Sequence, residues 1–166
     1  ILRLMGADIS LQNPREVGGE PVADIRVRYA PLHGVEIPAD QVPLAIDEFP
    51  ALFIAAACAQ GRTVLHGAEE LRVKESDRIA AMAAGLTALG VRNTVLDDGI
   101  VIEGGPMGAG TIHTYNDHRI AMSFAIAALR AEGEITVRDC GHVATSFPGF
   151  DTLARRLGLR ISAVAD

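Results

Sequence analysis

Two charged stretches of the sequence stand where helices are expected to begin. They are ELRVKESDRI at residues 70–79 and YNDHR at residues 115–119. A helix start carries partial positive charge on its unpaired amide hydrogens, so an arginine there is disfavoured by up to about 1 kcal/mol, whereas an anion is favoured. Arg78 and Arg119 hold such positions. Arginine can grip a phosphate or carboxylate with two parallel hydrogen bonds, so the pattern is compatible with an anion site to which Lys74 adds charge.

Each stretch also has a simpler interpretation. RVKESDR alone is more typical of a solvated helix start with local ion pairs. Asp47, before the apolar run EFPALFIAAA, is by itself expected to be only a helix cap, and so is Ser76. YNDHR is equally compatible with a cap whose Arg119 bridges to an acid. Local physics therefore leaves both interpretations open.

Other residues with chemical potential give weaker signals. His113 and His118 lie close in sequence, but no matching acid or thiol pattern accompanies them, so no metal site is predicted. Cys140, in DCGH, is expected to be a small buried residue beside a turn rather than a nucleophile. The glycine-rich residues 104–110 lack the Lys and Ser or Thr of a phosphate loop, so a hairpin loop is preferred there.

The elements that must position these residues recur along the chain. The stretches that begin at Asp47 and Asp117 both run from an acidic helix start through an Ala-rich helix, a Gly and a short strand to another helix. Gly6, Gly90 and Gly158 each end a helix and are followed by an expected strand. We therefore expect an α/β (α+β) fold of repeated strand units with buried helices inside.

Hydrophobic patterns predict the individual elements. A helix over residues 76–89 is amphipathic, whereas the helices from Asp47 and Asp117 are apolar nearly all round and should be buried. The expected buried face of the helix over residues 76–89 consists of Ile79, Met82, Ala83, Leu86 and Leu89. Alternation predicts strands at residues 23–29, 33–37, 99–104 and 134–139.

Composition excludes several classes of function. A length of 166 residues with 49% hydrophobic residues suits one domain, and a net charge of -6 argues against a nucleic-acid binder. Two distant cysteines indicate neither a disulfide framework nor a paired metal motif, and favour a cytoplasmic setting. The longest apolar run, residues 51–59, is too short to span a bilayer, so we expect a soluble protein. Residues 1–6 resemble the last turn of a helix, so we expect a piece of a longer chain.

Four motifs taken together resemble the 5-enolpyruvylshikimate-3-phosphate (EPSP) synthase family. They are IDEFPALFIAAA, ELRVKESDRI, YNDHRIAMSFAIAAL and ATSFPGF, in the family's order, and the resemblance runs over nearly the whole chain. LRVKESDR with TSFP looks closer to the glyphosate-tolerant bacterial branch. The resemblance implies a two-domain enolpyruvyl transferase in which each domain is an inside-out α/β barrel of βαβαββ units. Residues 1–166 would be most of the C-terminal domain, with the N-terminal domain absent and the fragment alone inactive.

The resemblance also implies the reaction. The family transfers the enolpyruvyl (carboxyvinyl) group of phosphoenolpyruvate to the 5-hydroxyl of shikimate 3-phosphate, a step of aromatic amino acid biosynthesis. It uses no cofactor and no metal. The implied partners are these two small molecules and the missing N-terminal domain, with no nucleic acid and no membrane.

Residue roles follow by motif. Asp47 would accept the proton of the attacking hydroxyl, Glu75 would handle the proton at the enol carbon, and Lys74 would lie between the substrates as a charge partner and proton donor. The implied substrate-binding residues are Lys74, Arg78, Arg119, Asp47, Asp117 and His118.

One position departs from the family's pattern, and two alternatives remain. Many relatives have Lys where ATSFP has Thr145, which puts the number of cations on the phosphate in doubt. A UDP-N-acetylglucosamine enolpyruvyl transferase would share the fold, but that family relies on a cysteine of the other domain and fits KESDR and NDHR less well. The remaining alternative is a non-catalytic anion-binding domain.

Overall fold

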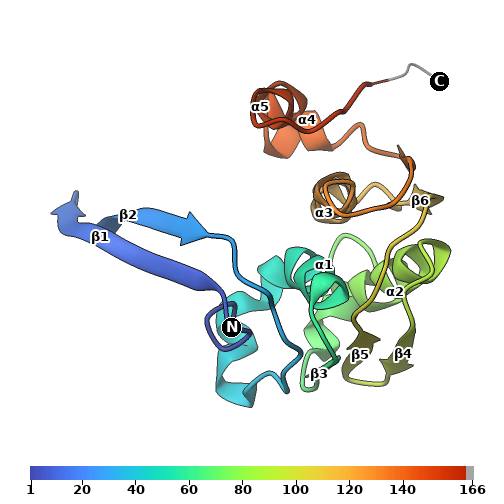
Figure 1. Cartoon of the computed structure of the whole chain (residues 1–166), viewed down its shortest axis with the longest axis horizontal. Helices are drawn as coiled ribbons and strands as arrows, with labels where there is room; N and C mark the ends of the chain where they lie inside the picture. The colour runs from blue at the N-terminus through green and yellow to red at the C-terminus, as the bar shows by residue number, and fades with distance from the viewer. Residues whose placement is uncertain (164–166) are drawn as a thin grey trace.

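Three helices, α1, α2 and α3, pack on one another, and short sheets lie around them (Figure 1). The structure, a computed structural model, describes residues 1–163. In chain order its elements are β1 (Asp8–Val17), β2 (Glu20–Arg28), η1 (Ala39–Gln41), η2 (Pro43–Glu48), α1 (Phe49–Cys58), β3 (Arg62–Leu65), η3 (Glu69–Val73), α2 (Arg78–Ala88), β4 (Asn93–Leu96), β5 (Gly99–Glu103), β6 (Gly110–His113), α3 (His118–Ala127), β7 (Ile135–Arg138), α4 (Val143–Ser146) and α5 (Phe150–Arg156).

Residues 33–103 form one βαβαββ unit, as the resemblance implied. The helices α1 and α2 alternate with strands of a sheet whose order is β3-β5-β4, with β5 antiparallel to both neighbours. The expected strand at residues 33–37 is reduced to two parallel bridges, His33 to Gln60 and Glu36 to Val64. A second unit begins with β6, α3 and β7, in which the strands pair in parallel.

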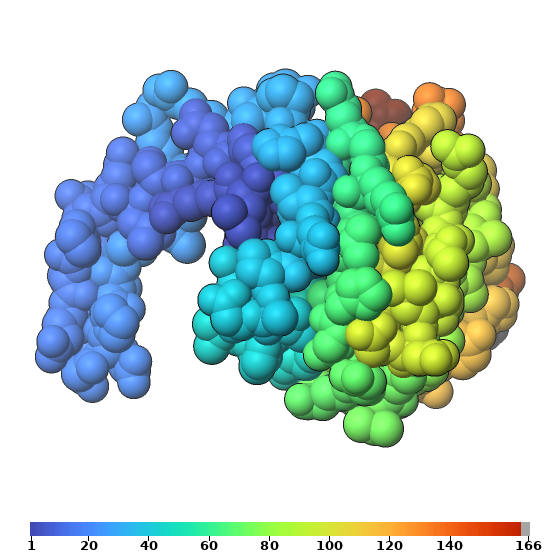
Figure 2. Space-filling model, turned by 90° about the horizontal axis from the view of Figure 1, so that it is seen from below, coloured from blue at the N-terminus to red at the C-terminus, as the bar shows by residue number. Residues whose placement is uncertain are grey.

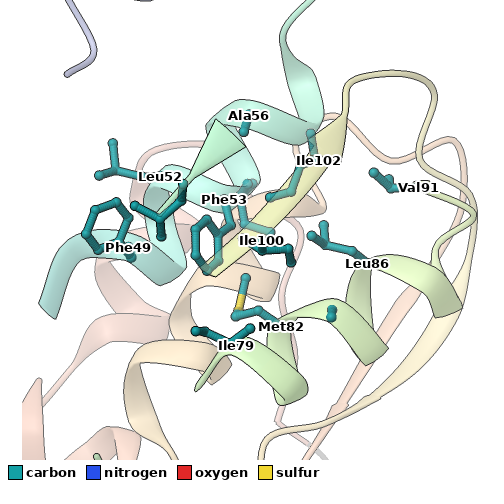
Figure 3. Close-up of a cluster of buried hydrophobic side chains, with 14 of the residues drawn as sticks. Phe49, Leu52, Phe53, Ala56, Ile79, Met82, Leu86, Val91, Ile100 and Ile102 are labelled. Atoms are coloured by element: carbon teal, nitrogen blue, oxygen red, sulfur yellow. The ribbon is translucent and has the colours of Figure 1, made fainter. Parts of the chain in front are cut away.

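The core lies between α1, α2 and β5. In Figure 3 Phe53 of α1 lies beside Ile100 of β5 and Met82 of α2, and Phe49 of α1 lies on the other side of Phe53. All four side chains are buried. Burial of each such side chain contributes roughly 1.5–3 kcal/mol. The predicted buried face of α2 is confirmed, because each of its members is buried: Ile79, Met82, Ala83, Leu86 and Leu89.

The approach of α2 to α3 depends on a glycine. A Cβ atom added to Gly85 would lie 2.3 Å from Cζ of Phe124, whose side chain is fully buried. The expectation of buried Ala-rich helices holds for α1 but only in part for α3, because Ile126 of α3 is exposed, as is Leu129 just beyond it.

The β1–β2 hairpin projects from the rest of the molecule (Figures 1 and 2). Its register places Leu11 opposite Ile25 and Ile9 opposite Val27, so these four residues share one face. Leu11, Ile25 and Val27 are between 59% and 69% exposed. The described part of the chain therefore leaves this apolar face largely uncovered.

Two expected helix starts are shifted. The residue that caps α2 is Asp77, not Ser76, and its Oδ1 accepts a hydrogen bond from the amide of Ala80 at 2.9 Å. Asp47 is not a cap of α1: it lies in η2, and the N-cap position belongs to Glu48, which makes no side-chain cap bond. The 3-10 turn thus separates Asp47 from the helix and frees its carboxylate for other contacts.

Three further expectations are wrong. Residues 104–110 do not form a hairpin loop, because β5 pairs with β3 and β4 whereas β6 pairs with β7; they connect two sheets. Cys140 is exposed rather than buried. Gly158 follows the end of α5 and has a positive φ of 96°, but the described residues after it, 159–163, form no strand. No helix in residues 1–163 is both long enough and apolar enough to cross a membrane.

Candidate functional site

Asp117 connects the starts of two helices. As the cap of α3, its Oδ1 accepts hydrogen bonds from the amides of Arg119 at 2.9 Å and Ile120 at 3.4 Å. Its Oδ2 accepts from Oγ of Ser76 at 3.1 Å and from Nε of Arg78 at 2.8 Å, at the start of α2. One carboxylate therefore fixes the two charged stretches against each other.

The turn before α3 is held in an unusual backbone conformation. Tyr115 and Asn116 have φ values of 53° and 62°, in the left-handed region that residues other than glycine rarely adopt. The buried Thr114 accepts from the amide of Asp117 at 2.9 Å, and its hydroxyl donates to the carbonyl of Asp139 at 2.8 Å, beyond β7. These bonds hold the turn, and so they direct Asp117 towards α2.

Arg78 is completely buried and meets three carboxylates. Besides Asp117, its guanidinium donates to Oδ1 of Asp47 at 3.0 Å and to Oε2 of Glu75 at 2.6 Å. A buried cation needs such partners, because desolvation of an unpaired charge costs several kcal/mol. Burial alone raises the pKa of Asp117, but the hydrogen bond and charge of Arg78 outweigh it and hold that pKa below its ordinary value.

Lys74 and Arg119 are the more accessible cations, with side chains 21% and 35% exposed. Nζ of Lys74 lies 3.5 Å from Oδ1 of Asp47 and pairs with Glu70. Nη1 of Arg119 donates to the carbonyl of Asp47 at 2.9 Å and to Oε1 of Glu48 at 3.2 Å. A solute that approached these two partly exposed side chains would meet both cations beside Asp47.

The carboxylate of Asp47 is kept ionised by its surroundings. Burial alone raises its pKa, but the charges of Lys74 and Arg119, together with the hydrogen bond from Arg78, hold the pKa below its ordinary value. The hydrogen bond to Glu70, followed by the charge of Asp47, raises the pKa of Lys74. Both groups are therefore charged at neutral pH.

Six of the seven predicted site residues lie in one contact network: Asp47, Lys74, Glu75, Arg78, Asp117 and Arg119. His118 is the first residue of α3, with a side chain of intermediate exposure. Sequence reasoning missed Ser76 as a partner of Asp117, 41 residues away. It also missed Glu48 and Glu70, although the spacing of Glu70 and Lys74, four residues apart, was a local signal.

The site contains more carboxylates than cationic side chains. Within residues 1–163 its three cations contact five carboxylates, those of Asp47, Glu48, Glu70, Glu75 and Asp117. The side chains of Glu48, Glu70 and Glu75 are more than half exposed. An anion could therefore bind the cations only by displacing these carboxylates or by meeting further cations outside the described residues.

Two remaining expectations concern residues away from this network. Thr145, at the position where many relatives have Lys, is exposed on the four-residue helix α4. Within residues 1–163 no three His, Cys, Asp or Glu side chains come together in a way that could hold a metal ion.

Comparison with known proteins gives a consistent result. The family model of EPSP synthase (3-phosphoshikimate 1-carboxyvinyltransferase) matches residues 1–153. The chain is 66% identical to the 3-phosphoshikimate 1-carboxyvinyltransferase of Methylococcus capsulatus, over 97% of this chain and 37% of that protein. It is 64% identical to the protein of the same name from Alkalilimnicola ehrlichii, over 98% of this chain and 36% of that protein.

Solved structures share the fold. The EPSP synthase of Acinetobacter baumannii superposes with a TM-score of 0.97 at 55% identity, over 99% of this chain and 39% of that one. The enolpyruvyl transferase NikO of Streptomyces tendae superposes with a TM-score of 0.69 at 26% identity, over 99% of this chain and 36% of that one. The chain thus spans little more than a third of the proteins that it matches.

Proposed function

Because the chain belongs to the EPSP synthase family, we propose that its parent protein transfers the enolpyruvyl group of phosphoenolpyruvate to the 5-hydroxyl of shikimate 3-phosphate. Residues 1–166 would be most of the C-terminal domain, and the rest of the parent would supply the other half of the site. The network around Arg78 supports this proposal most directly, because it gathers carboxylates and cations from two helix starts.

The reaction requires three proton transfers, two in the first step and one in the second. In the first step the hydroxyl oxygen bonds to C2 of phosphoenolpyruvate, the hydroxyl loses its proton, and C3 gains one. In the second step the bond from C2 to the phosphate oxygen breaks and C3 loses a proton, which restores the double bond. A base for the hydroxyl and an acid that later acts as a base at C3 are therefore needed.

Asp47 is suited to the hydroxyl and Glu75 to the carbon. The lowered pKa of Asp47 keeps its carboxylate ionised and ready to accept a hydrogen bond from the hydroxyl. When Lys74 or Arg119 turns to an anionic substrate, Asp47 loses part of that stabilisation and becomes a stronger base. Glu75 has a half-exposed carboxylate with one oxygen fixed by Arg78, so the other can face a substrate.

The accessible cations would hold the substrate anions. Lys74 and Arg119 would exchange Glu70 and Glu48 for the phosphate or carboxylate of phosphoenolpyruvate. We propose that Arg78 joins them through a shift of one of its exposed partners, Glu75 or Asp47, while Asp117 continues to hold it and His118 supports the start of α3. Fixed cations in a closed cleft stabilise developing negative charge more than cations in water do.

Phosphate release by the purified full-length parent, with phosphoenolpyruvate and one of two acceptors, tests the proposal. We expect release with shikimate 3-phosphate and none with UDP-N-acetylglucosamine; the opposite preference would contradict the proposed acceptor, and no release with either would contradict the activity. The 166-residue chain alone should give no turnover, because half of the site is missing, and turnover by this fragment would show that its own residues suffice.

A further inference from the structure

Arg72 connects the charged stretch to a neighbouring strand turn. Its Nε donates to the carbonyl of Asp97 at 2.9 Å, and its Nη2 donates to the carbonyl of Leu96 at 2.6 Å. Leu96 is the last residue of β4, and Asp97 follows it in the turn that links β4 to β5. The third nitrogen, Nη1, donates to Oδ2 of Asp77 at 2.8 Å. The side chain is only 27% exposed, so all three nitrogens are committed in a partly shielded place.

Asp77 links Arg72 to the start of helix α2. Its other oxygen, Oδ1, caps the helix through the amide of Ala80. In the sequence Asp77 stands between Glu75 and Arg78, two residues of the candidate site. A displacement of Asp77 would therefore move both neighbours.

The same strand turn also holds the beginning of the charged segment. The amide of Ala68 donates to the carbonyl of Asp98 at 2.7 Å, and the amide of Gly67 donates to Oδ2 of Asp98 at 3.0 Å. Residues 67–77, which follow β3, are thus bound to the β4–β5 turn at their beginning and are held near it again by Arg72. Lys74 and Glu75 lie inside this closed segment.

We propose that Arg72 is a positioning residue for the transfer reaction, acting through Asp77 to place Lys74, Glu75 and Arg78. The inference rests on the proposed function. Only a planar guanidinium can reach two carbonyls and a carboxylate at once, and a lysine ammonium does not offer that fork. Displacement of a reacting group by about 1 Å can cost on the order of 100-fold in rate, so loss of this bracing should be visible in kinetics.

The test uses the full-length parent with Arg72→Gln, Asp77→Asn and the double variant. Asparagine still caps a helix, so Asp77→Asn removes the charge contact and keeps the cap. Arg62→Gln, at an exposed arginine of β3, is the matched control. For Arg72→Gln we expect kcat per folded molecule to fall at least about tenfold and the KM for phosphoenolpyruvate to rise. The double variant should be within about twofold of the worse single variant, since both changes break the same contact.

A merely structural role would give a different pattern. It would lower the folded fraction, measured by circular dichroism, and leave the KM for phosphoenolpyruvate and the KM for shikimate 3-phosphate unchanged. Kinetics per folded molecule within about twofold of the wild type, or additive effects in the double variant, would overturn the inference. If Arg72→Gln does not fold, Arg72→Lys takes its place in the test. We expect Arg72→Lys to lower kcat, and unchanged kinetics would again overturn the inference. No turnover by the wild-type parent and the Arg62→Gln control would instead overturn the proposed function on which the inference rests.

Discussion

The guanidinium of Arg78 and the carboxylate of Asp117 form a completely buried ion pair, with Nε 2.8 Å from Oδ2. The two residues are 39 positions apart and belong to the first turn of α2 and the cap of α3. Through this pair, the two charged helix starts, residues 70–79 and 115–119, form one structural unit. Its integrity should therefore control both stability and the geometry of the site.

Replacement of Asp117 by Asn should destabilise the fold. Asn keeps the hydrogen-bonding cap but leaves Arg78 with less compensation, and a broken buried pair costs about 3–5 kcal/mol. Because Asp47 and Glu75 still contact Arg78, we expect about 3 kcal/mol, measured by urea unfolding at pH 7. Asp40→Asn, at an exposed residue of η1, is the control and should change little. A loss no larger than that of the control would show that the pair is not needed.

The same pair should give a pH dependence of a definite sign. The pKa of Asp117 is lowered in the folded state, so its contribution to stability is complete above the unfolded value of about 3.9. It is lost as the pH falls through the lower folded value. The difference in unfolding free energy between wild type and Asp117→Asn should therefore shrink as the pH decreases below about 4. A difference that grows on acidification would contradict this.

Loss of the proton-handling or anion-binding residues should abolish turnover in the parent without unfolding it. Glu75→Gln removes the acid at C3, and Arg119→Ala removes an accessible cation. We expect Glu75→Gln to lower kcat/KM at least about 100-fold, because general acid–base catalysis contributes about 10²–10⁴. We expect a loss of at least about 100-fold for Arg119→Ala as well, because loss of one group that stabilises developing charge costs about 10²–10³. Glu69→Gln, an exposed neighbour on η3, is the control. Near-normal rates in both variants would refute the assigned roles.

Glu48 competes with any anion for Arg119, from which its Oε1 lies 3.2 Å away. Both side chains are partly exposed, and such an ion pair is worth about 0.2–1 kcal/mol. Glu48→Gln in the parent should therefore lower the KM for phosphoenolpyruvate by up to about fivefold, with little change in kcat. A higher KM would mean that Glu48 orients Arg119 instead of occupying it.

Gly85→Ala should weaken the contact between α2 and α3. The added methyl group would lie 2.3 Å from the ring of Phe124, which is enclosed by the core and cannot move freely. Overpacking of this kind costs about 1–3 kcal/mol, more than the gain in helix propensity from Gly to Ala. Ala84→Ser, at the exposed preceding position, also adds one heavy atom and should be nearly neutral in thermal unfolding. Equal melting temperatures for the two variants would contradict the contact.

Periodicity and repeats predicted the helices well but not the pairing of charges. The buried face of α2 follows from the spacing of Ile79, Met82 and Leu86, which a helix brings to one side. The contact of Ser76 with Asp117 depends on how α2 and α3 pack, and no local pattern encodes that packing.

The starts of the helices were the least predictable feature. Asp47 has the residue type of a cap, yet the 3-10 turn before Phe49 takes it out of the cap position. A cap residue has extended backbone, whereas Asp47 lies inside a 3-10 turn, and residue preferences are too weak to decide between these two conformations. The complete burial of Arg78 was also not predicted. It depends on three carboxylates that converge from separate segments, and no local pattern indicates this.

The uncovered face of the β1–β2 hairpin affects how the chain behaves at the bench. A two-stranded ribbon with Leu11, Ile25 and Val27 in water has both an apolar surface and open backbone edges, which favour association between molecules. Association stabilises folded molecules by mass action, so the melting temperature of the isolated chain should rise with protein concentration. Each stability measurement on the isolated chain should therefore be compared across a dilution series of the protein.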